Sequence, residues 1–212
     1  MTAKDMFSHR VSILTGHYGT GKTEVSVNLA LALAAEGEQV MLADLDIVNP
    51  YFRSRERRPL LEKAGVRVIS SSQACSDADV PALPAELLTI LENREIRGIL
   101  DIGGDPVGAR VLARFQPKIV QEDYQLIFVL NANRPEVRDA ESAAAYLRSI
   151  EAVTGLTCSG LVNNTHLCGE TTPAEIRKGA ALAQEVSRQT GIPILCHTAE
   201  RRFLESLSDL GE

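Results

Sequence analysis

Short apolar runs alternate along the chain with longer stretches that favour helix. The runs are mostly continuous rather than alternating in polarity, which is typical of strands covered by helices on both faces. The predicted strands are 11–15, 40–44, 66–69, 99–102, 126–131, 160–163 and 194–196. The predicted helices are 22–36, 53–64, 86–93, 108–115, 136–154, 173–190 and 201–210. This order predicts an α/β fold: a doubly wound, mostly parallel sheet of about seven strands, with the site at the carboxyl ends of the strands.

The loop between the first strand and the first helix has the pattern G-x-x-x-x-G-K-T. Its glycines let the backbone curl so that N–H groups point at phosphate oxygens, and the helix N-terminus adds partial positive charge. The lysine can reach the β- and γ-phosphates, and the threonine hydroxyl can bind Mg²⁺. A glycine-rich turn that caps an ordinary helix is the minor alternative. We predict a nucleoside triphosphate site formed by Gly16, His17, Tyr18, Gly19, Thr20, Gly21, Lys22 and Thr23.

A second predicted strand end carries a carboxylate for the metal. Asp101 comes at the end of an apolar run and is followed by Gly103 and Gly104. In P-loop proteins the acid at such a strand end holds Mg²⁺, directly or through water. The glycines allow a backbone N–H to approach the γ-phosphate, and we assign Gly104 to the nucleotide site. Many strands end in Asp, so this assignment depends on the phosphate loop.

A third strand end has the sequence D-x-D. Side chains two residues apart on an extended segment point to the same side, so Asp44 and Asp46 can face one site. The alternative is a polar turn in which Asp46 or Asn49 caps the next helix. Capping stays open for Asn49. We predict catalytic roles for Asp44, Asp46 and Lys22, and a metal site formed by Thr23, Asp46 and Asp101.

These segments together resemble the MinD/ParA/CobQ-type nucleotide-binding domains, which have a deviant phosphate loop and include the ArsA-like ATPases. The resemblance covers 16–23, 44–50, 101–104 and 161–164. It implies that Asp46 orients the attacking water and that Asp101 serves Mg²⁺. It also implies that Asn163 or Asn164 reads the adenine edge, with 198–200 packed near the base.

One position departs from that group. Its dimer-switching members carry a second lysine directly after the first glycine of the loop, and this lysine reaches the partner subunit's phosphates. The chain has His17 there, which is neutral or partly charged near pH 7. A neutral imidazole cannot match a permanent cation in stabilising charge on the leaving phosphate. Dimer-coupled hydrolysis is therefore in question, whereas a homodimer is not excluded.

Composition limits the remaining functions. The 212 residues are 44% hydrophobic and carry a net charge of −6, which predicts one domain over 1–212. The acidic balance and the 4% aromatic content argue against direct nucleic acid binding. No apolar run approaches the ~18 residues of a membrane span, and the first ten residues lack the apolar core of a signal peptide. Scattered cysteines without a C-x-x-C pair predict a cytoplasmic location. They are Cys75, Cys158, Cys168 and Cys196.

Four weaker signals leave alternatives open. The arginines of 53–58 suit either a segment that senses phosphate or grips an acidic partner, or a solvated helix face. The apolar stripe of 201–210 is expected to dock on the sheet rather than on a membrane, because its polar side is largely acidic. Asn131–Pro135 is expected to line the cleft opposite the loop. His166 and Cys168 are suited to half of a metal site, without a second pair.

The function predicted from these patterns is that of an ATP-binding protein and slow Mg-dependent ATPase, a nucleotide switch for a protein partner of unknown identity. ATP is expected over GTP because the second half of the chain has no N-K-x-D run. The alternative is an ATP-dependent small-molecule kinase or carboxylate-activating ligase on the same fold. Nucleotide binding with negligible turnover stays open because of His17.

Overall fold

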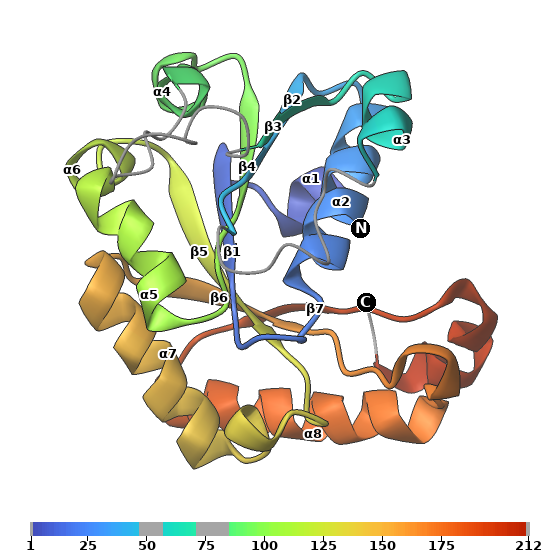
Figure 1. The fold of residues 1–212 in the computed structure, drawn as a ribbon. Helices are drawn as coiled ribbons and strands as arrows, with labels where there is room; N and C mark the ends of the chain where they lie inside the picture. The colour runs from blue at the N-terminus through green and yellow to red at the C-terminus, as the bar shows by residue number, and fades with distance from the viewer. Residues whose placement is uncertain (1, 47–56, 71–84, 211–212) are drawn as a thin grey trace.

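The computed structural model describes residues 2–46, 57–70 and 85–210. Its seven strands form one sheet in the order β3-β2-β4-β1-β5-β6-β7, and every pair in it is parallel (Figure 1). The strands are β1 (Val11–Thr15), β2 (Val40–Asp44), β3 (Arg67–Ser70), β4 (Arg97–Asp101), β5 (Tyr124–Leu130), β6 (Cys158–Asn163) and β7 (Ile194–His197). The predicted sheet is confirmed. That 1–212 is a single domain stays a prediction.

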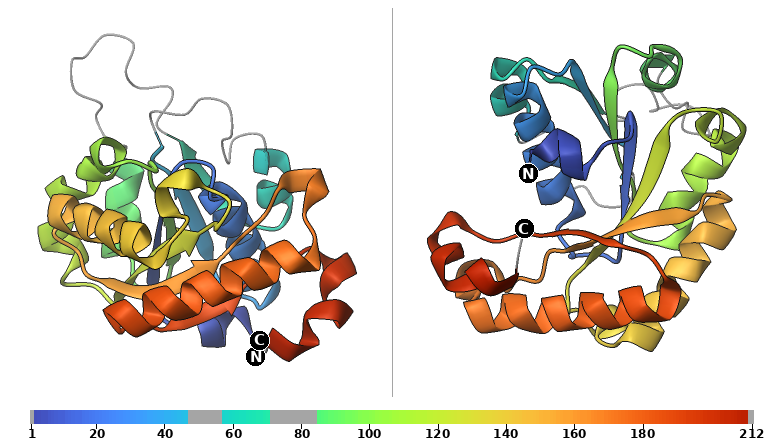
Figure 2. Two further views of the ribbon diagram at one scale, coloured as in Figure 1. Left: turned by 90° about the horizontal axis from the view of Figure 1, so that it is seen from below. Right: turned by 180° about the vertical axis from the view of Figure 1, so that it is seen from behind.

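Helices cover both faces of the sheet (Figure 2). One face packs against α1 (Ala3–Met6), α2 (Lys22–Ala35) and α3 (Arg58–Lys63). The other packs against α4 (Ala85–Glu92), α5 (Pro106–Ala109), α6 (Gln116–Ile119), α7 (Ala140–Thr154) and α8 (Pro173–Thr190). Neighbouring residues of a strand point to opposite faces of the sheet. Phe128 lies in the core that includes α4–α8, and Ile127 and Val129 lie in the core that includes α1–α3. Continuous apolar strands are thus buried on both sides.

The predicted helix 108–115 is wrong in its extent. The chain forms α5, the 3-10 helix η2 (Arg110–Arg114) and α6 instead. Asp105 starts the first piece, because its side chain accepts a hydrogen bond from Gly108 N at 2.7 Å. Pro117 lies in the first turn of α6, where its missing N–H does least harm, and it could not continue a helix from η2.

The predicted helix 136–154 is also divided. It begins as the 3-10 helix η3 (Pro135–Val137), and α7 starts after Asp139. The Asp139 side chain accepts a hydrogen bond from Ser142 N at 2.8 Å and caps α7. A short 3-10 helix that the sequence did not predict, η4 (Cys168–Glu170), precedes α8.

The C-terminal segment is not the α-helix that the apolar stripe predicted. It forms the 3-10 helices η5 (Arg201–Phe203) and η6 (Glu205–Leu210), which lie beside α8. From α8, Arg177 forms an ion pair with Asp209 and donates to Ser206 O at 2.6 Å. Leu207 is buried, whereas Leu204 is exposed. Of the described helices, none has the length and apolarity needed to cross a membrane.

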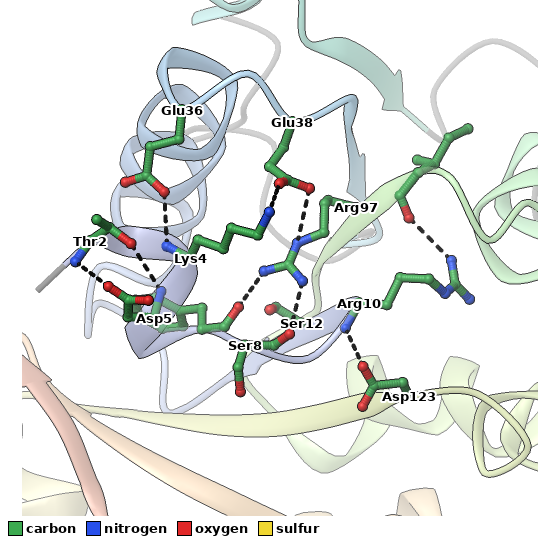
Figure 3. Close-up of polar contacts among 12 residues, drawn as sticks. Thr2, Lys4, Asp5, Ser8, Arg10, Ser12, Glu36, Glu38, Arg97 and Asp123 are labelled. Carbon is green, nitrogen blue, oxygen red and sulfur yellow. Dashed lines mark hydrogen bonds and ion pairs between the residues drawn. The ribbon is translucent and has the colours of Figure 1, made fainter.

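Two arginines tie the amino ends of the strands to the segments around them (Figure 3). Arg10 donates to Ile90 O at 2.6 Å and to Leu91 O at 3.0 Å, so it caps the last turn of α4. Arg97 donates to Ser8 O at 2.9 Å. These cations have structural partners at the end of the sheet opposite the phosphate loop.

Candidate functional site

The strand order brings the predicted site residues to one edge of the sheet. β1 lies between β4 and β5, so the loops that follow these three strands meet at their carboxyl ends. β2 lies on the other side of β4, in a register that places Asp44 opposite Asp101. Asp101 in turn lies opposite Leu14, next to the phosphate loop. The D-x-D, the metal acid and the loop are therefore neighbours.

The phosphate loop has the curled backbone that its glycines predicted. Gly16, Gly19 and Gly21 have φ values of 145°, 74° and 82°. A Cβ at Gly16 would lie 2.4 Å from Val129 O, and one at Gly21 would lie 2.3 Å from Asn164 Nδ2. No side chain fits at these two positions, because sterics and backbone angle both exclude it.

The other loop side chains have distinct surroundings. The Thr20 hydroxyl is buried and donates to His17 O at 2.9 Å, so it braces the loop from within. Tyr18 is exposed at the rim. The His17 ring lies edge-on to Tyr146, with a centroid distance of 5.1 Å, and its Nδ1 is 3.6 Å from Glu136 Oε2.

Lys22 is the buried cation of the site. Only 6% of it is exposed, and its Nζ donates to His17 O at 3.4 Å. Burial lowers the pKa of Lys22, while the negative charges of Asp101, Asp46 and Asp105 act in the opposite direction. Gly104 packs directly against the ammonium group of Lys22, because a Cβ on Gly104 would lie only 2.7 Å from Lys22 Nζ. The ammonium group is thus placed between the loop and the carboxylates.

Asp101 is a buried carboxylate whose two oxygens accept no well-formed hydrogen bond from the described residues. Burial, with the charges of Asp44 and Asp46, raises the pKa of Asp101 to about 7, although the nearby Thr23 hydroxyl and Lys22 act to lower it. Buried polar atoms normally have partners. A carboxylate beside a threonine hydroxyl suits Mg²⁺, which takes oxygen ligands and is usually held by few protein groups. These residues fit the predicted metal.

Asp44 and Asp46 lie close enough to Asp101 for both of their charges to raise its pKa. Asp44 is buried, and its Oδ1 accepts a hydrogen bond from Asp46 N at 3.2 Å. The Asp46 side chain extends toward Gly103, where a Cβ would lie 3.6 Å from its Oδ1. The roles of Asp44 and Asp46 in catalysis and metal binding stay predictions.

Part of the basic cluster and the capping alternative for Asn49 lie outside the described residues. Arg53 and Arg55 belong to that part. Arg58, the first residue of α3, pairs with Glu62 at 2.8 Å and is exposed. This pair favours the solvated helix face for the described end of the cluster.

The two asparagines after β6 differ in their surroundings. Asn163 is fully buried, donates to Ile176 O at 3.2 Å and accepts from the Thr165 hydroxyl at 2.7 Å. Asn164 is half-buried and donates to Thr20 O at 2.7 Å. The reading of adenine stays a prediction, and Asn164 is the more accessible of the two.

The suggested half metal site has no second half among the described residues, which contain no group of three His, Cys, Asp or Glu side chains able to hold a metal. Cys168 Sγ lies 3.8 Å from His166 Nδ1. Cys158 is buried, and burial raises its pKa to about 12. Cys75 lies outside the described residues.

Two residues beside the site have contacts that the sequence did not predict. The hydroxyl of Tyr146, on α7, donates to Gly104 O, and burial raises the pKa of Tyr146 to about 12. Arg134 Nε donates to Gly19 O at 2.8 Å, so this segment touches the phosphate loop instead of lining the cleft opposite it. A single aromatic or basic residue far along the chain carries no motif. Only the fold reveals either contact.

Comparisons with known proteins agree with this geometry. The ParA family model, described as NUBPL iron-transfer P-loop NTPase, matches residues 6–55. The cytosolic Fe-S cluster assembly factor cfd1 of Emericella nidulans is 36% identical over 95 residues, 45% of this chain and 26% of that protein. The iron-sulfur cluster carrier protein of Escherichia coli K12 is 50% identical over 40 residues, 19% of this chain and 11% of that protein. Over these segments the chain resembles P-loop NTPases of the MinD/ParA type.

Solved structures show that the chain shares its fold with other P-loop proteins. The nucleotide-binding protein of Archaeoglobus fulgidus, solved with ADP, has a TM-score of 0.51 and 20% identity over 99% of this chain and 88% of that chain. The cell division protein FtsY of Thermotoga maritima has a TM-score of 0.58 and 22% identity over 87% of this chain and 59% of that chain. The matches to the two curated relatives span about a quarter or less of their lengths.

The raised pKa of Asp101 predicts how the stability of this protein depends on pH. Because the folded-state pKa is about 7 and the unfolded value is 3.8, the folded protein binds the extra proton, and the stability it provides is lost as pH rises through 7. At pH 8 the buried charge costs on the order of 2–4 kcal/mol. Asp101→Asn should therefore raise the melting temperature by several degrees at pH 8 and by clearly less at pH 5, where only part of the loss between pH 3.8 and 7 has occurred.

Circular dichroism without nucleotide or Mg²⁺ measures this difference, because the chain has no Trp to report by fluorescence. Asp123→Asn is the control. The pKa of Asp123 is lowered, chiefly by its hydrogen bond with His9, so this carboxyl is expected to show no loss of stability as pH rises. An equal effect of Asp101→Asn at both pH values would contradict the prediction.

Proposed function

We propose that this protein is an ATP-binding, slow Mg-dependent ATPase that acts as a nucleotide switch for a protein partner. The observation that carries the proposal is the meeting of the phosphate loop, Lys22, Asp46 and Asp101 at one edge of the sheet. The proposal extends beyond nucleotide binding, which the family and the fold support. ATP rather than GTP and a cytoplasmic location are part of it.

Each group has a role that its position supports. The loop amides and Lys22 bind the phosphates, and Lys22 is held toward the γ-phosphate by the carboxylates around it. Thr23 and Asp101 hold the metal. Mg²⁺, when bound with ATP, neutralises charge on the β- and γ-phosphates. Asp46 orients the attacking water, and the Gly104 N–H approaches the γ-phosphate.

His17 is the reason to propose a switch rather than a fast enzyme. Its ring packs on Tyr146 of the same chain, and its Nδ1 lies near Glu136. The His17 imidazole is therefore packed against residues of its own chain. The isolated protein then lacks the second lysine that would stabilise charge on the leaving phosphate. A protein partner that places a positive charge beside the leaving phosphate would start hydrolysis.

The isolated protein is expected to hydrolyse ATP well below ~10 s⁻¹, the median for enzymes. Positioned cations contribute ~10³-fold or more in related phosphoryl transfers, and the chain lacks the lysine that would act from position 17. Steady-state phosphate release at saturating Mg-ATP measures the rate. Turnover above ~10 s⁻¹ without a partner would refute the switch proposal.

His17→Lys tests the origin of the slow rate. This variant should hydrolyse ATP faster if two copies can face each other loop to loop. His9→Lys is the control, because His9 pairs with Asp123 at the amino end of the strands, far from the loop. Acceleration by both variants would show a general charge effect instead.

A second candidate function comes from the names of the relatives. They are Fe-S cluster assembly factors and carriers, so iron–sulfur cargo is the alternative for the partner-dependent step. Thiolates are the ligands of such clusters. Among the described cysteines, Cys168 is exposed, whereas burial raises the pKa of Cys158 to about 12 and of Cys196 to about 11. A cluster would then use Cys168 from two copies, or Cys75.

Anaerobic reconstitution with iron and sulfide tests this candidate. Iron bound per chain and the visible absorbance of a cluster are measured for the wild type, Cys168→Ser and Cys75→Ser. Retention of iron in both variants would exclude these ligands. An ATP-dependent kinase or ligase on this fold stays the other alternative, and a screen of metabolites for stimulated ATP turnover separates it from the switch.

A further inference from the structure

The phosphate loop is held from outside by side chains of the second half of the chain. Two consecutive backbone carbonyls of the loop, those of Gly19 and Thr20, accept hydrogen bonds from these side chains. Asn164 Nδ2 donates to Thr20 O at 2.7 Å, and Arg134 Nε donates to Gly19 O at 2.8 Å. Asn131 Nδ2 lies 3.5 Å from the same Gly19 oxygen. These contacts fix the loop before any ligand arrives.

Arg134 is the charged member of this set, and it lies directly against the loop. A Cβ on Gly19 would stand 2.6 Å from Arg134 Cζ, so the guanidinium occupies the space that the glycine leaves open. Arg134 is half-buried. Burial and, after it, the charge of Arg134 lower the pKa of His166.

Arg134 has no carboxylate partner among residues 2–46, 57–70 and 85–210. The three other half-buried arginines in these ranges, Arg10, Arg97 and Arg177, each pair with a carboxylate. The exposed Arg138, four residues along the chain, lies 3.7 Å from Asp139 Oδ2. The hydrogen bond to Gly19 O replaces part of the hydration that the half-buried guanidinium loses, but a neutral carbonyl does not balance its charge. An anionic ligand in the loop would supply the missing charge, and Arg suits phosphate because its N–H groups form a rigid, permanently charged fork.

We propose that Arg134 is a nucleotide-positioning residue whose charge complements the bound phosphates while its Nε fixes the Gly19 carbonyl. Arg134 acts on the bound nucleotide rather than on the departing phosphate, because it contacts the outer side of the loop. This inference rests on the proposed nucleotide site.

Two substitutions separate the charge from the hydrogen bond. Arg134→Gln keeps an N–H donor for Gly19 and removes the charge, whereas Arg134→Lys keeps the charge and loses the planar fork. Arg138→Gln makes the same charge change on an exposed neighbour and serves as the control. Calorimetry gives Kd for Mg-ATP and Mg-ADP, and phosphate release gives kcat for each variant.

Arg134→Gln should weaken ATP and ADP binding by the same factor, ~10–100-fold, the value of a charged hydrogen-bonding group. Arg134→Lys should stay within about 5-fold of the wild type, and Arg138→Gln within about 2-fold. The kcat at saturating ATP should change by less than about 3-fold in all of them, since the charge acts on ground-state binding.

Wild-type affinity in Arg134→Gln would overturn the inference, and so would equal losses in the Gln and Lys variants or a loss in Arg138→Gln. Lys22→Ala in the same series separates this failure from that of the proposed function. If the wild type binds no nucleotide, the proposed function fails. If Lys22→Ala loses binding and Arg134→Gln does not, only the role of Arg134 fails.

Discussion

Lys22→Ala should weaken Mg-ATP binding at least ~100-fold, the largest effect expected of any single substitution in this chain. Its ammonium group lies under the loop, and the negative charges of Asp101, Asp46 and Asp105 act on it. Removing the cation takes away a direct phosphate contact. It also leaves carboxylates that repel the triphosphate. Both changes oppose binding.

Calorimetric titration with Mg-ATP measures the loss. Lys118→Ala is the matched control, because Lys118 is exposed and pairs with Glu92 at 2.7 Å on the surface. Circular dichroism verifies that each variant is folded. Unchanged affinity in folded Lys22→Ala protein would remove the phosphate-loop assignment.

Asp46→Asn should lower kcat by ~10²–10⁴-fold and leave ATP affinity within about 3-fold of the wild type. The reason is that a carboxylate which orients water acts in the transition state, whereas ground-state binding depends on the loop and Lys22. The position of Asp46 beside Gly103 suits this role. Single-turnover hydrolysis with enzyme in excess measures the chemical step apart from binding.

Asp105→Asn is the control for the loss of a nearby negative charge. Asp105 also acts on Lys22, but its side chain caps α5, a role that Asn fills well. Its kcat should stay within about 3-fold. A loss of ATP affinity in Asp46→Asn, with an intact rate per bound enzyme, would contradict the assigned role.

Local signals in the sequence were enough for α8. α8 has the predicted bounds, because Thr172 caps its start and Gly191 takes the left-handed conformation at its end. The cap at Asp139 and the proline at 117 were visible too, yet the apolar periodicity outweighed them in the prediction. At both places the cap or the proline sets the helix boundary, and the apolar periodicity does not.

The site could be predicted only as far as motifs reach. The loop, Asp46 and Asp101 follow from strand ends, but the register that sets Asp44 opposite Asp101 depends on strand pairing. Which of two adjacent asparagines faces the interior also depends on the pairing of β6 with its neighbours. Contacts such as that of Tyr146 with Gly104 join residues 42 positions apart and have no sequence signature.

During synthesis, the phosphate loop leaves the ribosome well before Arg134 and Asn164, the residues that hydrogen-bond to its carbonyls. Arg134 and Asn164 follow their contacts in the loop by 115 and 144 residues. At about 5–20 residues per second, the growing chain spends on the order of ten seconds with the loop exposed and its carbonyls unsupported. β1 also waits for β4 and β5 before it becomes the central strand. Tight nucleotide binding during synthesis therefore reports that the second half of the sheet has folded.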